Sequence, residues 1–178
     1  ILNRGKRKLA DFGIEGAESI TGDINDESGI QALFEDRTFD VVANFIAFTP
    51  DQVERDVHLF NGKCGQYIFI SSASAYQKPP ANPFITESTP LKNPYWQYSR
   101  DKIACEMVCQ QAYRDKDFPI TIIRPSLTYE TVIPLSIGAW EDFTIVDRMR
   151  TGKPVIVQGD GTSLWTITHS RDFAVGFT

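Results

Sequence analysis

The sequence predicts an α/β fold built on a parallel, doubly wound sheet. Near-continuous apolar runs at 40–47, 66–70 and 119–123 alternate with stretches whose apolar residues recur at helical spacing. Such runs are typical of strands that are buried on both faces, and parallel strands require a long crossover, usually a helix, between them. This order of elements therefore predicts βαβ units with helices covering both faces of the sheet.

Three segments between these runs predict the covering helices. Residues 26–34, 50–60 and 97–113 each place apolar side chains on one helical face. Pro50 suits the first turn of its helix, because the backbone N–H that proline lacks has no partner there. A further short strand is predicted to end at 19–20.

The same alternation divides the chain into two parts. It continues over 1–129, apart from a loop at 77–94 that is rich in Pro and Asn. Beyond that point a helix at 143–149 and a short strand at 155–157 are predicted in an otherwise irregular segment. We therefore predict one domain over 1–129 and the beginning of a smaller lobe over 130–178.

Composition narrows the functional class. The 178 residues carry 18 basic and 23 acidic side chains, a net charge of −5 that argues against a general nucleic-acid binder. No apolar run reaches the roughly 18 residues of a membrane span. The three cysteines cannot all pair with one another, and Cys105 and Cys109 have no second pair with which to bind zinc. We expect a cytoplasmic protein without a metal site.

Ser72, Tyr98 and Lys102 form the candidate catalytic set. Tyr98 and Lys102 are four residues apart on a predicted helix and therefore project from one face. A nearby ammonium favours the phenolate, which lowers the pKa of about 10 that makes a free tyrosine a poor base near neutrality. Ser72 is predicted to end a strand, at the edge where ligands of open α/β sheets bind. Its hydroxyl is suited to holding a substrate oxygen against the tyrosine.

The order of the segments around this set is more specific than the Tyr-x-x-x-Lys spacing, which also occurs by chance in helices. The chain resembles the extended short-chain dehydrogenase/reductase family, the NAD(P)-dependent epimerase/dehydratases, which have a Rossmann-type domain and mostly act on nucleotide sugars. The resemblance covers essentially the whole chain. The matching segments are 22–24, 40–47, 67–76, 84–90, 98–102, 123–129 and 159–161.

The resemblance implies a role for each matching position. Ser72, Tyr98 and Lys102 take the catalytic roles. Asp23 lies in a turn that meets the adenine base, and Asn44 stands beside the cofactor where many members have histidine. The implied cofactor-binding positions are Arg4, Asp23, Ile24, Asn44, Tyr98, Lys102 and Pro125.

Arg4 bears on the choice of cofactor. In dinucleotide-binding domains an acidic residue after the second strand accepts the ribose hydroxyls, whereas an arginine accommodates a 2′-phosphate. The sequence reads Leu-Asn-Arg-Gly-Lys-Arg over 2–7, so we expect NADP to be preferred over NAD, with Lys6 or Arg7 assisting. The alternative is that this segment is a solvated basic loop.

Two departures from the family pattern affect this interpretation. The Gly-x-x-Gly-x-x-Gly loop that brings a helix N-terminus to the cofactor pyrophosphate is not found in the sequence. The smaller lobe is also incomplete by comparison with the family. We therefore interpret the chain as a fragment that lacks the glycine-rich loop and the C-terminal part, and expect it to bind cofactor poorly by itself.

The activity and partners follow from the same resemblance. Ala73 and Ser74 stand where dehydratases usually carry an Asp-Glu pair, so we favour an epimerase or reductase acting on a small molecule such as a nucleotide sugar. A homodimer is expected through the helices at 50–61 and 97–114. The alternative from another class is a non-catalytic relative that binds RNA or a protein partner.

Overall fold

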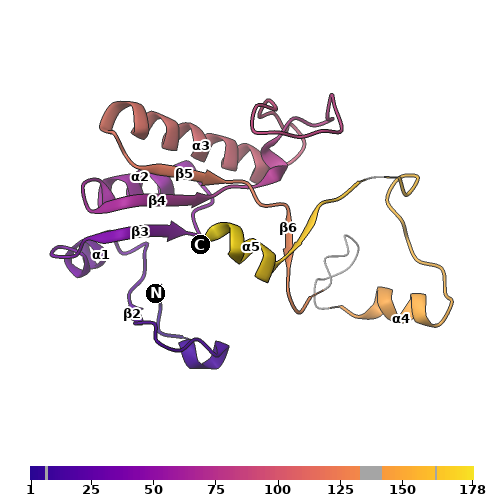
Figure 1. Ribbon diagram of the computed structural model, residues 1–178, viewed down its shortest axis with the longest axis horizontal. Helices are drawn as coiled ribbons and strands as arrows, with labels where there is room; N and C mark the ends of the chain where they lie inside the picture. The colour runs from indigo at the N-terminus through magenta and orange to yellow at the C-terminus, as the bar shows by residue number, and fades with distance from the viewer. Residues whose placement is uncertain (7, 133–141, 163) are drawn as a thin grey trace.

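Three parallel strands form the centre of the fold in the computed structural model (Figure 1). The structure describes residues 1–6, 8–132, 142–162 and 164–178. The central strands pair in the order β3 (Phe39–Asn44), β4 (Cys64–Ile70) and β5 (Ile120–Ile123). Because all three run in the same direction, the segments that follow them meet at one edge of the sheet.

The part of the first 120 residues that the structure describes also contains a separate two-stranded ribbon and three α-helices. Two short strands pair in parallel as a separate ribbon, β1 (Leu2–Asn3) and β2 (Ile20–Thr21), with the 3-10 turn η1 (Leu9–Phe12) between them. The crossover helices are α1 (Glu27–Leu33), α2 (Pro50–Phe60) and α3 (Gln97–Lys116). Among the described residues, no helix is both long and apolar enough to cross a membrane.

One hydrophobic core lies between the sheet and these helices. Tyr67 and Phe69 lie on the same face of β4 and are fully buried. On the opposite face of the sheet, Val41 of β3 is 48% exposed. Parallel pairing with helical crossovers confirms the predicted α/β, Rossmann-type class, and the described core occupies one face of the sheet. The residues of α1, α2, α3 and their ends that share this buried cluster with Tyr67 and Phe69 are Ile30, Phe34, Val53, Val57, Leu59, Phe60, Cys105, Cys109 and Ala112.

Local sequence signals explain where the helices begin and end. Thr49 and Gln52 form a capping box at the start of α2, which satisfies backbone N–H groups that have no partner inside the helix. Asp26 caps α1 by accepting from the Gly29 N–H at 3.2 Å. Helix α3 ends at Lys116 and is capped by Asp117, whose φ of 52° is the left-handed conformation common at helix ends.

The last part of the chain packs less tightly than the first. Strands β6 (Leu127–Tyr129) and β7 (Ile167–His169) pair in parallel, accompanied by α4 (Thr144–Arg150) and α5 (Ser170–Phe177). The described residues that are buried all lie between positions 30 and 118. Helix α5 lies beside the end of β3 (Figure 1), where the Phe177 and Phe45 rings are 5.5 Å apart.

The strand predicted at 155–157 is wrong. Within the described residues this segment is not part of any sheet, and Ile156 and Val157 are 74% and 61% exposed. Apolar, β-branched residues favour a strand only where a neighbouring strand accepts their hydrogen bonds and a surface buries their side chains.

Candidate active site

Lys102 lies at the edge of the sheet where β3 and β4 end. It is 1% exposed, and its Nζ donates to the carbonyl oxygens of Ala47 and Ile70, both at 2.7 Å. Ala47 follows β3 and Ile70 ends β4, so one ammonium group joins the ends of two neighbouring strands. Burial lowers the pKa of Lys102, and the neighbouring Cys105, Cys109 and Glu106 of α3 oppose this only in part.

Tyr98 is half-buried one helical turn before Lys102. Its ring lies 4.7 Å from that of Trp96 and 6.3 Å from that of Phe48, measured between ring centroids. The Lys102 Nζ is 5.7 Å from the Tyr98 ring centroid and 4.7 Å from that of Phe48. The spacing therefore does bring the tyrosine and the ammonium to one side of α3, inside a partly exposed aromatic cluster.

Ser72 lies just beyond the strand rather than at its end. Strand β4 ends at Ile70, and Ser72 begins the 3-10 turn η2 (Ala73–Ala75). The Ser72 Oγ accepts from the Ser74 N–H at 3.2 Å and lies 2.9 Å from the Ser74 Oγ. A serine hydroxyl that bonds a nearby backbone N–H competes with strand pairing, which explains why the chain turns here.

Pro125 lies beside this turn. Its carbonyl oxygen accepts from the Ala73 N–H at 2.9 Å, and the Ile123 carbonyl accepts from the Ser71 N–H at 2.7 Å. The segment after β5 is thereby held against the residues that flank Ser72. Two segments far apart in the sequence, each matching the family pattern, are adjacent at this edge.

Sequence reasoning missed a buried charge pair behind the turn. Glu106 is fully buried and accepts from both Nε and Nη2 of Arg124, at 2.9 and 2.7 Å, and from the Ser71 hydroxyl at 2.5 Å. Arg124 also donates to the Tyr76 hydroxyl at 3.1 Å. The available signal was Glu106 four residues after Lys102 on α3, together with an arginine directly after a strand.

Asn44 lies in a second buried polar cluster. Its amide Nδ2 donates to Asp56, and its Oδ1 accepts from the backbone N–H groups of Ile46 and Ala47 at 2.7 and 2.8 Å. Asp56 also accepts from the Tyr67 hydroxyl at 2.5 Å. The Asn44 side chain thus shapes the loop after β3, the same loop whose Ala47 carbonyl holds Lys102.

The predicted adenine and ribose positions lie at the ends of β1 and β2. Arg4 is exposed directly after β1, while Arg7 lies outside the described residues. The Asp23 carboxylate accepts from the backbone and the side-chain N–H groups of Asn25 at 3.0 and 3.1 Å. Ile24, which follows Asp23, is half-buried against the hydrophobic core.

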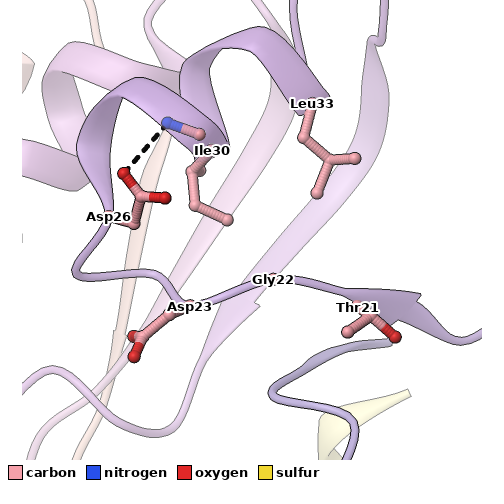
Figure 2. A pocket seen from close by; sticks show the side chains of 7 residues that line it. Thr21, Gly22, Asp23, Asp26, Ile30 and Leu33 are labelled. Carbon is pink, nitrogen blue, oxygen red and sulfur yellow. Dashed lines mark hydrogen bonds between the residues drawn. The ribbon is translucent and has the colours of Figure 1, made fainter.

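A pocket of about 180 Å³ lies between the end of β2 and α1. Figure 2 shows Ile30 and Leu33 of α1 on one side of the Gly22 backbone, with the Asp23 carboxylate directed to the other side. The turn at Gly22 and Asp23 therefore borders a small recess that is lined by both apolar and acidic side chains. The pocket is lined by Thr21, Gly22, Asp23, Asp26, Gly29, Ile30 and Leu33.

A parallel sheet with Ser72, Tyr98 and Lys102 near the carboxyl ends of its strands defines a Rossmann-type domain of the short-chain dehydrogenase/reductase kind. The chain belongs to the NAD dependent epimerase/dehydratase family, which residues 2–178 match.

Known proteins share this sequence pattern and fold. The Uncharacterized protein y4nG of Sinorhizobium fredii is 27% identical over 180 residues, which cover 92% of this chain and 42% of that protein. The dTDP-glucose 4,6-dehydratase of Bacillus anthracis, solved in complex with NAD, has a TM-score of 0.74 at 18% identity, with 99% of this chain and 60% of that chain covered.

A third relative is an epimerase. The UDP-glucuronic acid 4-epimerase of Bacillus cereus, solved in complex with UDP-glucuronic acid and NAD, has a TM-score of 0.67 at 19% identity, with 95% of this chain and 57% of that chain covered. At these identities the two structures show a shared fold. The chain spans between 42% and 60% of the length of these three proteins.

Proposed function

We propose that this chain is the cofactor-binding core of an NAD(P)-dependent enzyme that acts on a hydroxyl or carbonyl carbon of a nucleotide sugar or a related substrate. The observation that carries the proposal is the grouping of a half-buried tyrosine, a buried ammonium and a serine hydroxyl at one edge of a parallel sheet. The Lys102 Nζ lies 5.7 Å from the Tyr98 ring, and Ser72 follows the strand that Lys102 holds.

Each side chain has a role that its surroundings support. Tyr98 exchanges a proton with the substrate oxygen, and the Lys102 ammonium lies on the same side of α3, 5.7 Å from the Tyr98 ring centroid. Ser72 donates a hydrogen bond to the same substrate oxygen. Both act on an oxygen atom, so the set suits the interconversion of an alcohol and a carbonyl.

The lysine also fits a nicotinamide dinucleotide. A lysine ammonium has three N–H donors, and the structure describes two acceptors for Lys102, the carbonyls of Ala47 and Ile70. The third donor and the Tyr98 hydroxyl form a set suited to the hydroxyls of a ribose. When bound, the cofactor supplies or accepts the hydride that accompanies the proton moved by Tyr98.

Turnover of nucleotide sugars by the full-length protein tests this function. A panel that includes UDP-glucuronic acid and UDP-glucose, with NAD or NADP, should give turnover that falls by about 100-fold or more in Tyr98→Phe, because a positioned acid/base contributes that much. Tyr113→Phe, an exposed tyrosine on the same helix, is the matched control. Absence of turnover together with salt-sensitive RNA binding that ignores Tyr98 would favour the non-catalytic alternative.

The preference for NADP is a finer part of this proposal and depends on Arg4. The two solved relatives named above hold NAD, which supports a nicotinamide dinucleotide in general. If Arg4 binds the 2′-phosphate, Arg4→Ala should weaken NADPH binding about tenfold and leave NADH binding unchanged. Paired fluorescence titrations of the full-length protein decide this, with Lys8→Ala, another exposed cation, as control. Equal loss for both cofactors would reject the role.

Two structural proposals accompany the chemistry. We assign residues 1–129 to the cofactor-binding domain and 130–178 to the beginning of the substrate lobe, which the sparse burial of the second part supports. Helices α2 and α3 are the proposed dimer contact, and sedimentation of the full-length protein tests this. A monomer at micromolar concentration would reject it.

A further inference from the structure

A chain of side-chain hydrogen bonds connects Ser72 to the loop in front of α3. The Ser72 and Ser74 oxygens lie 2.9 Å apart, and Ser99 donates to the Ser74 Oγ at 2.8 Å. The Asn93 Nδ2 in turn donates to the Ser99 Oγ at 3.2 Å. Ser99 is fully buried and Asn93 is 8% exposed, so the far end of the chain is shielded from solvent.

The neighbours of Asn93 fix which way its amide points. Its Oδ1 accepts from the Tyr95 N–H at 3.1 Å, and its Nδ2 donates to the Ser74 carbonyl at 2.8 Å. A backbone N–H is only a donor and a carbonyl is only an acceptor. A flipped amide would place two donors or two acceptors face to face at both contacts, so the nitrogen must be directed toward Ser99.

This fixed amide sets the direction of every hydroxyl that follows. Ser99 receives a hydrogen from Asn93 and gives its own to Ser74, which leaves the Ser74 hydrogen for Ser72. The Ser72 Oγ also accepts from the Ser74 N–H at 3.2 Å. A hydroxyl oxygen has two lone pairs and one hydrogen. With both lone pairs engaged, Ser72 retains its hydrogen as the group available to a ligand.

We propose that Asn93, Ser99 and Ser74 are positioning residues that orient the Ser72 hydroxyl as a hydrogen-bond donor to the substrate oxygen. This inference rests on the proposed function, in which Ser72 contacts that oxygen. A donor aimed in advance needs no reorientation when negative charge develops on the oxygen, which is where preorganised dipoles contribute most to a rate. Ser72 keeps its proton throughout, and the proton exchanged with the substrate belongs to Tyr98.

Neutron diffraction from deuterated crystals of the full-length protein tests, without any substrate, which hydroxyl donates in each of these hydrogen bonds. We expect the Ser99 deuterium to point at the Ser74 Oγ and the Ser74 deuterium to point at the Ser72 Oγ. A Ser72 deuterium directed at Ser74 would overturn the proposal. Because this measurement needs no turnover, it decides the point even if the enzyme activity proposed above fails.

Kinetics test whether the direction matters for the reaction. With the nucleotide sugar that the panel identifies, Ser74→Ala should lower kcat about tenfold, the effect of one lost hydrogen bond, and change KM by less than about twofold. Ser74→Thr, which keeps a hydroxyl, should restore kcat, and Ser99→Ala should resemble Ser74→Ala. Ser88→Ala removes an exposed hydroxyl that lies 2.9 Å from the Thr86 hydroxyl of the same loop, and serves as the control. Unchanged kcat in Ser74→Ala, or no restoration by threonine in a variant that melts like the wild type, contradicts the proposal.

Discussion

Two fully buried carboxylates behind the sheet edge, Asp56 on α2 and Glu106 on α3, are held in different ways. Both are 0% exposed. Glu106 uses its two oxygens for the two arms of one guanidinium, Arg124, at 2.9 and 2.7 Å. Asp56 contacts the guanidinium of the adjacent Arg55 through one oxygen, at 3.2 and 3.4 Å. Its other oxygen accepts from the neutral groups of Asn44 and Tyr67.

The two carboxylates differ in the contacts that replace their lost hydration. Burial raises the pKa of Asp56 above its usual value, and the hydrogen bonds from Tyr67, Arg55 and Asn44 offset this only in part. In the other pair, the hydrogen bonds that Arg124 donates to Glu106 raise the pKa of Arg124 above its usual value. Glu106 contacts one guanidinium through both of its oxygens, whereas Asp56 contacts a guanidinium through one oxygen and neutral donors through the other. The first arrangement compensates the lost hydration of a carboxylate better than the second.

The largest effect that this comparison predicts is that of Glu106→Gln. The variant keeps the shape of the side chain but leaves the Arg124 cation without its counter-charge, so it should lower the free energy of unfolding by about 3 kcal/mol. Urea denaturation followed by circular dichroism at neutral pH measures this. Glu87→Gln, at an exposed loop position, should change stability by less than about 0.5 kcal/mol. Equal losses of unfolding free energy in Glu106→Gln and Glu87→Gln would contradict this prediction.

Asp56→Asn should lower the free energy of unfolding by less, about 2 kcal/mol near pH 4. The size of this loss should depend on pH. Because the folded pKa is raised above 3.8, the folded state holds a proton that the unfolded state has released. Stability of the wild type therefore falls as pH rises from about 4 through the raised pKa, whereas asparagine does not titrate. The cost of the substitution should shrink between about pH 4 and pH 7 in urea titrations. A cost that grows with pH would show that the pKa is lowered instead.

The smallest effects should come from the tyrosines of the two clusters. Tyr67→Phe removes a donor to the buried Asp56 and should cost about 1 kcal/mol. It should also raise the pKa of Asp56 further, since that hydrogen bond lowers it. Tyr76→Phe removes an acceptor for the half-buried Arg124 and should cost about 0.5 kcal/mol. Thermal unfolding of the two variants measures both losses of stability. A larger loss in Tyr76→Phe than in Tyr67→Phe would contradict the comparison of the two clusters.

The sequence predicts the regular elements of this molecule better than its polar contacts. Helix α2 was expected over 50–60 and is found at Pro50–Phe60, because periodicity, a capping threonine and a proline all indicate the same boundary. The strand at 155–157 failed because apolar composition does not reveal whether a partner strand is present. Spacing placed Lys102 on the face of Tyr98, yet only the fold shows that the ammonium also meets two backbone carbonyls.

The hydrogen-bonded clusters could not be predicted from sequence patterns, for a physical reason. Asn93 and Ser99 are six residues apart, but the Ser74 that both contact is contributed by a different part of the chain. The same holds for Ser71 and Glu106, which are separated by 35 positions. Such contacts depend on tertiary geometry, and polar residues in a loop or on a helix carry no periodic signal of their own.

The two carbonyl contacts of Lys102 affect which residue of the Tyr98 and Lys102 pair evolution would retain if activity were lost. A descendant that lost all turnover would still need the ammonium to tie the ends of β3 and β4 together. Selection on folding alone would then preserve the lysine, while the partly exposed tyrosine would be free to drift. In such a lineage, retention of the tyrosine distinguishes a working enzyme from an inherited scaffold, and retention of the lysine does not.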